Sequence, residues 1–88
     1  MARYKVILKP SVEKDLRSLP REVVARVFKR LEMLRDDPLP SHSVKLSGAE
    51  QLYRIRVGEY RVIYGRDKGS KQVIIHYVRH RRDVYRKL

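Results

Sequence analysis

Three arginines, Arg54, Arg56 and Arg61, lie in two neighbouring runs in which apolar and charged residues alternate. Alternation over residues 52–57 and again over residues 60–64 is typical of half-buried β-strands. A Gly-Glu link joins the two runs and suits a tight turn whose first central residue needs a positive φ. The pattern therefore predicts a β-hairpin that carries all three arginines on one face.

The turn sets the register of this hairpin. With Gly58-Glu59 as the loop, Arg56 lies directly opposite Arg61, and Arg54 lies opposite Ile63. The other face carries side chains that can be buried: Tyr53, Ile55, Val57, Tyr60, Val62 and Tyr64. Two arginines that face each other on an open sheet repel, at a cost of a few tenths of a kcal/mol up to roughly 1 kcal/mol. Folding alone does not require that arrangement.

A polyanion laid across the sheet would explain the arginine face. Guanidinium groups hold phosphate oxygens in a bidentate geometry, so a phosphate backbone is the simplest ligand. The alternative is a solvated strand face, because exposed strands often carry arginine and its stem covers apolar neighbours. For one arginine alone we favour the solvated face, and for three on one face we favour a binding site.

The C-terminal residues 79–88 form a second basic stretch, in which Tyr85 stands among four arginines. Cations can hold phosphates while an aromatic ring stacks on an unpaired base, which contributes about 1–3 kcal/mol per base. The alternative is a frayed, solvated C-terminus, since terminal residues are often poorly ordered. The composition of this stretch is compatible with both.

The chain has 88 residues, enough for a single domain over residues 1–88 with a modest core. It carries 22 Lys and Arg against 10 Asp and Glu, which gives a net charge of +12 at pH 7. This excess indicates nucleic acid or another acidic partner, with a membrane surface as the alternative. The apolar run of residues 6–8 is too short for a signal peptide or a membrane span, so we expect a cytoplasmic protein.

Metal binding is not expected from the residue types present. The chain has no cysteine, which excludes disulfides and thiolate zinc sites. The spacing of His42, His76 and His80 does not match a set of metal ligands. We therefore expect neither a metal ion nor a cofactor.

The first half of the chain predicts a short strand and two helices. Residues 3–8 end in an apolar run that Pro10 stops. Ser11 is the expected N-cap of a helix over residues 12–18, and Pro20 suits the first turn of a second helix. The second helix has an apolar stripe with i, i+3, i+4, i+7 spacing: Val24, Val27, Phe28, Leu31 and Leu34. This stripe is expected to cover one face of a sheet.

The second half predicts strands. Residues 36–43 contain two prolines and form a loop, and residues 44–46 are a brief extended segment before the hairpin. A turn over residues 65–70 leads to a last strand over residues 72–78. Two faces are predicted for this strand, Val73, Ile75 and Tyr77 on one and Ile74, His76 and Val78 on the other. It can therefore be covered on both sides or lie centrally in the sheet.

The element order β-α-α-β-β-β predicts an α+β fold. We expect an antiparallel sheet with the N-terminal helical hairpin packed on one face.

Three segments together resemble the RelE/ParE toxin superfamily of type II toxin–antitoxin systems: Val44-Lys45-Leu46-x-Gly48, Tyr53-Arg-Ile-Arg-Val-Gly-Glu-Tyr-Arg-Val-Ile-Tyr64 and His80-Arg-Arg-Asp-Val-Tyr-Arg86. The resemblance covers nearly the whole chain and implies a RelE-like fold, related to small microbial RNases. The last segment and the surroundings of Arg61 resemble the RelE branch. That branch implies a ribosome-dependent endoribonuclease that cleaves mRNA in the A site, inhibits translation and is neutralised by a cognate antitoxin.

The resemblance also implies the chemistry and the residues that carry it. Cleavage would be metal-independent: the ribose 2′-OH attacks the adjacent phosphate and leaves a 2′,3′-cyclic phosphate and a 5′-OH. Arg61 would hold the scissile phosphate, Arg81 would assist the leaving oxygen, and Tyr85 would stack on or orient the nucleotide. Arg54 and Arg56 take positions where the branch commonly has lysines. RNA binding is expected of further basic residues: Lys45, Arg79, His80, Arg82 and Arg86.

Arginine at the two lysine positions changes the chemistry. A lysine can give up a proton, whereas Arg54 and Arg56 are effectively always charged and make poor general bases. His80 has the intrinsic pKa of a base, and it could equally be only a phosphate donor. A site without a strong base can still act if the ribosome positions the RNA and electrostatics stabilise the transition state.

Two other functions remain alternatives. A ParE-like toxin would inhibit DNA gyrase and would need no aligned phosphate site, and a non-catalytic basic RNA-binding module is the third possibility. For the leading hypothesis the expected partners are the antitoxin, the ribosome and mRNA. DNA would be contacted only indirectly through the antitoxin, and no membrane is expected as a partner.

Overall fold

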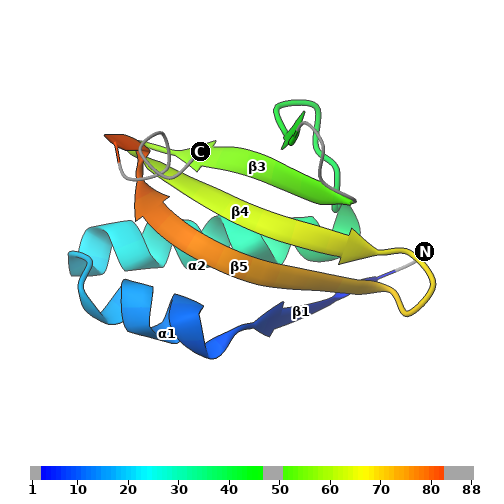
Figure 1. Ribbon diagram of the computed structural model, residues 1–88, viewed down its shortest axis with the longest axis horizontal. Helices are drawn as coiled ribbons and strands as arrows, with labels where there is room; N and C mark the ends of the chain where they lie inside the picture. The colour runs from blue at the N-terminus through cyan, green and yellow to red at the C-terminus, as the bar shows by residue number, and fades with distance from the viewer. Residues whose placement is uncertain (1–2, 47–50, 83–88) are drawn as a thin grey trace.

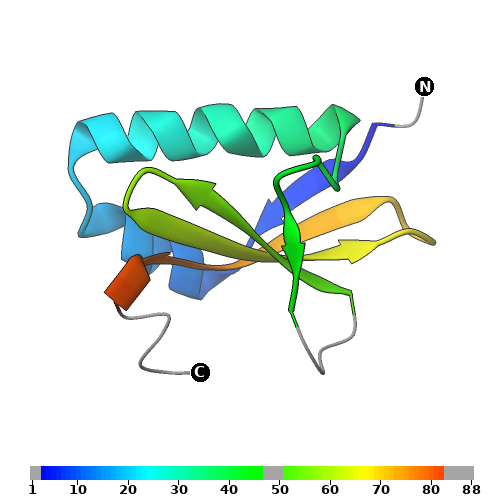
Figure 2. The same cartoon turned by 90° about the horizontal axis from the view of Figure 1, so that it is seen from above.

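The computed structural model describes residues 3–46 and 51–82. The elements follow in the order β1 (Lys5–Leu8), α1 (Pro10–Arg17), α2 (Arg21–Asp36), β2 (Val44–Lys45), β3 (Leu52–Val57), β4 (Tyr60–Asp67) and β5 (Gln72–His80). The strands form one sheet in the order β1-β5-β4-β3-β2 (Figure 1). Both helices pack on the same face of this sheet, where they share one core with it (Figure 2). The predicted α+β class, with its helical hairpin on one face, is confirmed.

Helix α1 begins earlier than predicted. Lys9 is its N-cap residue in extended backbone, and Pro10 is its first helical residue, a position that the fixed φ of proline favours. Ser11 therefore lies inside the first turn, where its hydroxyl donates to the backbone carbonyl of His76 at 3.2 Å. The N-cap role predicted for Ser11 is wrong, because a proline at the first helical position moves the start of the helix ahead of it.

Helix α2 starts directly after Pro20, which is its N-cap residue. The helix buries Val27, Leu31 and Leu34 against the sheet. Phe28 was predicted in the same stripe, but this residue is 45% exposed. Successive helical residues are rotated by about 100°, so Phe28 lies on the flank of a stripe that is centred on its neighbour Val27.

Strands β3 and β4 pair in the register that the turn predicts. Arg56 is opposite Arg61 and Val57 is opposite Tyr60. Gly58 has a φ of 60°, a conformation that glycine adopts without the strain of a side chain. The hairpin therefore presents its arginines and its aromatic residues on opposite faces, as expected.

Strands β4 and β5 are both longer than predicted. β4 continues through Gly65 to Asp67, although a turn was expected from residue 65, and β5 continues to His80. Gly65 is a sheet residue with close neighbours: a Cβ at this position would lie 3.2 Å from Nε2 of His76. This glycine marks close packing inside the sheet and not a turn.

The sheet is mixed. β1 pairs with β5 in parallel, with Val6 opposite Val73 and Leu8 opposite Ile75, while the other strand pairs of the described sheet are antiparallel. The prediction of an antiparallel sheet is wrong for this one pair. A connection of two helices lets β1 enter the sheet in the direction of β5, and apolar patterning carries no information about strand direction. β5 lies between β1 and β4, which confirms an internal position for it.

A β-bulge in β5 changes which of its residues face the helices. The register between β4 and β5 shifts at this point and skips His76. The buried apolar residues of β5 are Val73, Ile75 and Val78. Tyr77, predicted to share their face, is 45% exposed, and Val78 was predicted on the other face. Both predictions are wrong because the extra residue shifts the alternation by one position.

Candidate functional site

Three arginines from three strands form a row across the sheet. Arg56 of β3 is opposite Arg61 of β4, and Arg61 is opposite Arg79 of β5. Residues opposite each other in antiparallel strands point to the same face, so the three side chains share the face that the helices do not cover. We call Arg56, Arg61 and Arg79 the arginine row. The sequence predicts the first two on this face, whereas it predicts Arg79 only as part of a basic C-terminal stretch.

The members of the row differ in exposure. Arg61 is buried, with 8% of its surface exposed, whereas Arg56 is exposed. Arg61 was expected to be exposed on an open sheet face. That prediction is wrong, because β4 has a paired strand on each side. Nε of Arg56 donates to the carbonyl of Gly58 at 3.2 Å, which holds that side chain beside the turn. Arg54 is half-buried on the same face, two residues before Arg56 in β3.

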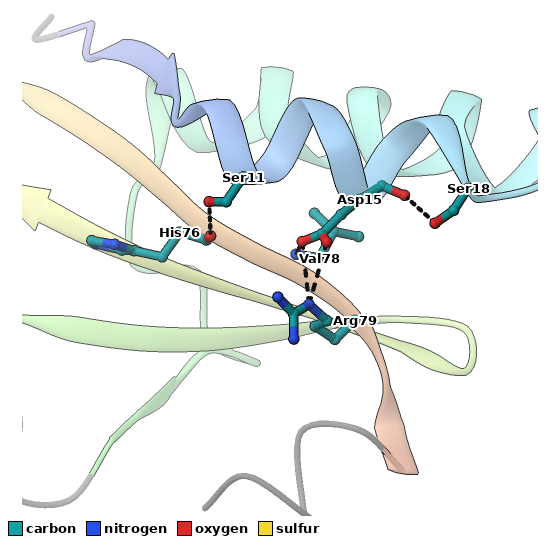
Figure 3. A network of polar contacts seen from close by, with 6 residues as sticks. All are labelled: Ser11, Asp15, Ser18, His76, Val78 and Arg79. Atoms are coloured by element: carbon teal, nitrogen blue, oxygen red, sulfur yellow. Dashed lines mark hydrogen bonds and ion pairs between the residues drawn. The ribbon is translucent and has the colours of Figure 1, made fainter.

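Arg79 is held by two neighbours. Its Nε lies 3.3 Å from Oδ1 and 3.4 Å from Oδ2 of Asp15. Its guanidinium carbon lies 5.1 Å from the centre of the Tyr77 ring. Figure 3 shows the side chains of Asp15 and Arg79 meeting where α1 runs beside β5. Without the extra residue of the bulge, strand alternation would turn Arg79 toward the helices.

The chain after β5 turns back to the hairpin. The backbone N–H of Arg81 donates to the carbonyl of Glu59 at 2.8 Å, and the guanidinium of Arg81 lies 3.5 Å from a carboxylate oxygen of the same residue. The backbone N–H of Arg82 donates to Nδ1 of His80 at 3.3 Å. Arg81 is therefore anchored at the turn that Arg56 also contacts.

Two predicted RNA-binding residues lie on the helix side of the sheet. His80 is opposite Tyr60, and their rings meet edge to face with centres 5.4 Å apart. Lys45 is opposite Tyr53, whose side chain is in the core. Strand alternation therefore separates His80 and Lys45 from the arginine row, so the structure gives no support to His80 as a base there.

The remaining predicted residues, Tyr85 and Arg86, lie outside the described part of the chain. Sequence reasoning missed Asp15 and Tyr77 as neighbours of the row. Tyr77 was missed because the bulge moves it to the face that strand alternation did not predict. Asp15 had one weak signal, its i, i+4 spacing from Ser11 on an amphipathic helix, but a contact with a residue 64 positions away cannot be read from local patterns.

The chemistry of the row follows from its residue types. Arginine is effectively always protonated, so the row can bind a phosphate and stabilise negative charge that develops on it, but it cannot act as a base. At the bulge, burial and the nearby charge of Lys9 hold the pKa of His76 below its usual value of 6.5. In the core, burial raises the pKa of Tyr64 to about 12.

Two negative findings hold for residues 3–46 and 51–82. No group of three or more His, Asp or Glu side chains there is placed to hold a metal ion. No helix in these ranges is long and apolar enough to cross a membrane.

Comparison with known proteins places the chain in a family. Residues 6–85 match the family of the ParE toxin of type II toxin–antitoxin systems, parDE. A curated protein of Methanocaldococcus jannaschii named RelE1 is 28% identical over 87 residues, which cover 96% of this chain and 97% of that protein.

Two solved structures show the same fold. The chain is 34% identical to a protein in the archaeal RelE–RelB complex from Pyrococcus horikoshii, with a TM-score of 0.81, over 92% of this chain and 97% of the other. It is 26% identical to a protein in the RelBE2 toxin–antitoxin complex from Mycobacterium tuberculosis, with a TM-score of 0.79, over 89% of this chain and 98% of the other. The chain therefore belongs to the RelE/ParE superfamily of type II toxin–antitoxin toxins.

Proposed function

We propose that this toxin is a metal-independent endoribonuclease that cleaves mRNA in the ribosomal A site and so inhibits translation in the cytoplasm. The observation that carries the proposal is the arginine row, three guanidinium groups at neighbouring cross-strand positions of one sheet face. Cross-strand like charges oppose folding, and a phosphate backbone is the ligand that compensates for them. The relation of the chain to RelE proteins supports the same function.

The proposed reaction is an internal transfer at one phosphate of the RNA. The 2′-oxygen forms a bond to phosphorus, the bond to the 5′-oxygen breaks, and the products are a 2′,3′-cyclic phosphate and a 5′-OH. The 2′-OH loses its proton to solvent and the leaving 5′-oxygen takes one from solvent, so the transfer is balanced. Arg61 holds the scissile phosphate and its developing charge, Arg81 assists the leaving oxygen, and Tyr85 stacks on or orients the nucleotide.

This mechanism relies on positioning and charge more than on a strong base. Arg54 and Arg56 cannot accept the 2′-OH proton, and His80 is on the other face of the sheet. The ribosome would hold the 2′-OH in line with the phosphate, and the arginine row would stabilise the charged transition state.

Inhibition of DNA gyrase is the second candidate function, because the matching family carries the ParE name. Induction of the gene separates the two functions. Translation should stop and mRNAs should be cut within codons, with 5′-OH and cyclic phosphate ends that primer extension and end labelling can identify. Arrested replication and DNA damage with intact mRNAs would favour gyrase instead.

A cognate antitoxin is the proposed protein partner, since the relatives from P. horikoshii and M. tuberculosis were solved as complexes of toxin and antitoxin. A groove of about 350 Å³ between β1 and α2 is the proposed docking site for an amphipathic segment of it, whose apolar side chains would enter the groove. The groove is lined by Lys5, Val6, Leu8, Phe28, Leu31, Glu32 and Arg35. The net charge of +12 favours an acidic segment that becomes ordered on binding.

The groove is tested with two substitutions on α2. Phe28→Asp should weaken antitoxin binding at least tenfold, because it places a charge in the groove. Met33→Asp is the matched control, because Met33 is 56% exposed on the same helix and does not line this groove. Calorimetry at two salt concentrations should also show weaker binding at high salt. Equal losses for the two variants would place the antitoxin elsewhere.

A further inference from the structure

Helix α1 lies beside β5 where β1 ends. β1 pairs with β5 as far as Leu8 and Ile75, and the N–H of Lys9 donates to the carbonyl of Ile75 at 3.3 Å. β5 then continues to His80 without further pairing from β1. The backbone groups on this edge of β5 therefore need other partners.

Two side chains of α1 supply those partners. The hydroxyl of Ser11 donates to the carbonyl of His76 at 3.2 Å, and the carboxylate of Asp15 accepts the N–H of Val78 at 3.2 Å (Figure 3). Four residues of a helix rise about 6 Å, and two residues of a strand advance about 6.6 Å. The i, i+4 spacing of Ser11 and Asp15 thus matches the i, i+2 spacing of their partners, so α1 continues the pairing that β1 began.

Asp15 also makes a contact that the pairing with β5 does not require. The same carboxylate also contacts Nε of Arg79, the end member of the arginine row. The two side chains are 16% and 25% exposed, whereas in the other ion pairs of the described chain both side chains are at least 41% exposed. Ser11, one turn earlier on α1, makes the backbone contact alone.

We propose that Asp15 is a positioning residue for RNA cleavage, an inference that rests on the proposed function. Its carboxylate holds Arg79 at Nε, so that the two terminal nitrogens at the far end of the planar guanidinium remain for phosphate oxygens. It also offsets part of the repulsion between Arg79 and Arg61 in the substrate-free protein. Asp15 acts through Arg79 and has no contact with RNA itself.

The decisive variant is Asp15→Asn. Asparagine has the same shape, and its side-chain oxygen can still accept the N–H of Val78, but it lacks the charge that orients Arg79. We expect kcat on ribosome-bound mRNA to fall about tenfold, because Arg79 then no longer holds the phosphate in its reactive position. We expect KM to fall as well, because the guanidinium of Arg79 is released from its ion pair with Asp15 and its charge then attracts RNA more strongly. A loss of folded protein would lower the apparent kcat and would leave KM unchanged.

Two further variants separate positioning from structure. In an Arg79→Gln background, Asp15→Asn should change kcat less than twofold, because the group on which it acts is gone. Ser11→Ala is the matched control, since it removes a hydrogen bond to the same strand edge; it should lower the melting temperature and keep kcat. The proposal would be overturned if Asp15→Asn lowered kcat equally in the native and the Arg79→Gln backgrounds. It would also be overturned if Ser11→Ala lowered kcat as much as Asp15→Asn.

An RNA-binding assay keeps this inference distinct from the proposed function. If the native protein cuts no mRNA on ribosomes, the proposed function fails. Even in that case, the affinity of the native protein and of the same variants for a single-stranded RNA hexamer tests the role of Asp15. Tighter binding by Asp15→Asn, absent in the Arg79→Gln background, supports control of Arg79 by Asp15. The same increase in both backgrounds, or none in either, overturns it.

Discussion

Arg56 and Arg61 face each other across the hairpin, yet Arg61 is buried and Arg56 is exposed. Arg79 flanks Arg61 on its other side. Each like-charge cross-strand pair costs up to roughly 1 kcal/mol. A bound phosphate would compensate this repulsion. Stability and RNA binding are therefore expected to oppose each other at Arg61.

Replacement of Arg61 by Gln tests this opposition. The melting temperature should stay the same or rise slightly, because the repulsion between Arg61 and the two arginines opposite it is removed. Ribosome-dependent cleavage should fall roughly a hundredfold or more, as is typical when a preorganised charge at a reacting group is lost. Sulfate should raise the melting temperature of the native protein more than that of the variant. Thermal melts with and without sulfate, together with primer extension, measure both effects. Normal cleavage, or a melting temperature far below native, would make Arg61 a structural residue.

Arg81→Ala should reduce cleavage at least tenfold while the fold is kept. The ion pair of Arg81 with Glu59 is about half exposed, at 49% and 59%, so it contributes only a few tenths of a kcal/mol. The backbone hydrogen bond between these residues is unaffected by the substitution. Glu59→Gln is the control, because it removes the same ion pair and keeps the guanidinium. If Glu59→Gln lost as much cleavage activity as Arg81→Ala, cleavage would depend on the ion pair and not on the guanidinium of Arg81 itself.

The stability of the protein should fall as the pH drops below 6.5, and His76 should account for part of this loss. Burial and the charge of Lys9 hold the pKa of His76 below 6.5 in the folded protein. The unfolded chain then binds the proton more readily, so this contribution is complete above pH 6.5 and is lost as the pH falls toward the folded pKa. Melts between pH 5 and pH 8 should show a smaller decrease for His76→Gln than for His42→Gln. Identical pH profiles of the two variants would exclude the role of His76.

Tyr64→Phe should lower the free energy of unfolding by about 1 kcal/mol at neutral pH. The Tyr64 hydroxyl donates to the carbonyl of Pro38 at 2.7 Å and ties β4 to the loop after α2. Burial raises its pKa to about 12, above the usual 10, so its contribution is present below pH 10 and is lost as the pH rises toward 12. Urea unfolding at pH 7 and in this alkaline range should show the difference between native and variant shrinking. A difference that stays constant with pH would contradict the assignment.

The hairpin is the part of the fold that local sequence determined best. Alternation assigned the faces of β3 and β4, and the Gly58-Glu59 turn set their register, because both are short-range properties of the backbone. The apolar stripe of α2 was equally readable, apart from Phe28 at its flank. These predictions needed only residues within a few positions of one another.

The candidate site needed the tertiary structure. Arg79 joins Arg56 and Arg61 only because a bulge at His76 shifts the alternation of β5. A bulge is defined by how two strands pair, so it cannot be read from the sequence of one strand. Arg61 is buried because β4 acquires a neighbour on each side. The contact of Asp15 with Arg79 joins residues 64 positions apart. The sequence by itself determined which residue types carry charge and which local elements hold them. Only the tertiary structure decided that Arg79 meets Arg61, through the bulge in β5, and that Asp15 meets Arg79, through the packing of α1 along the edge of β5.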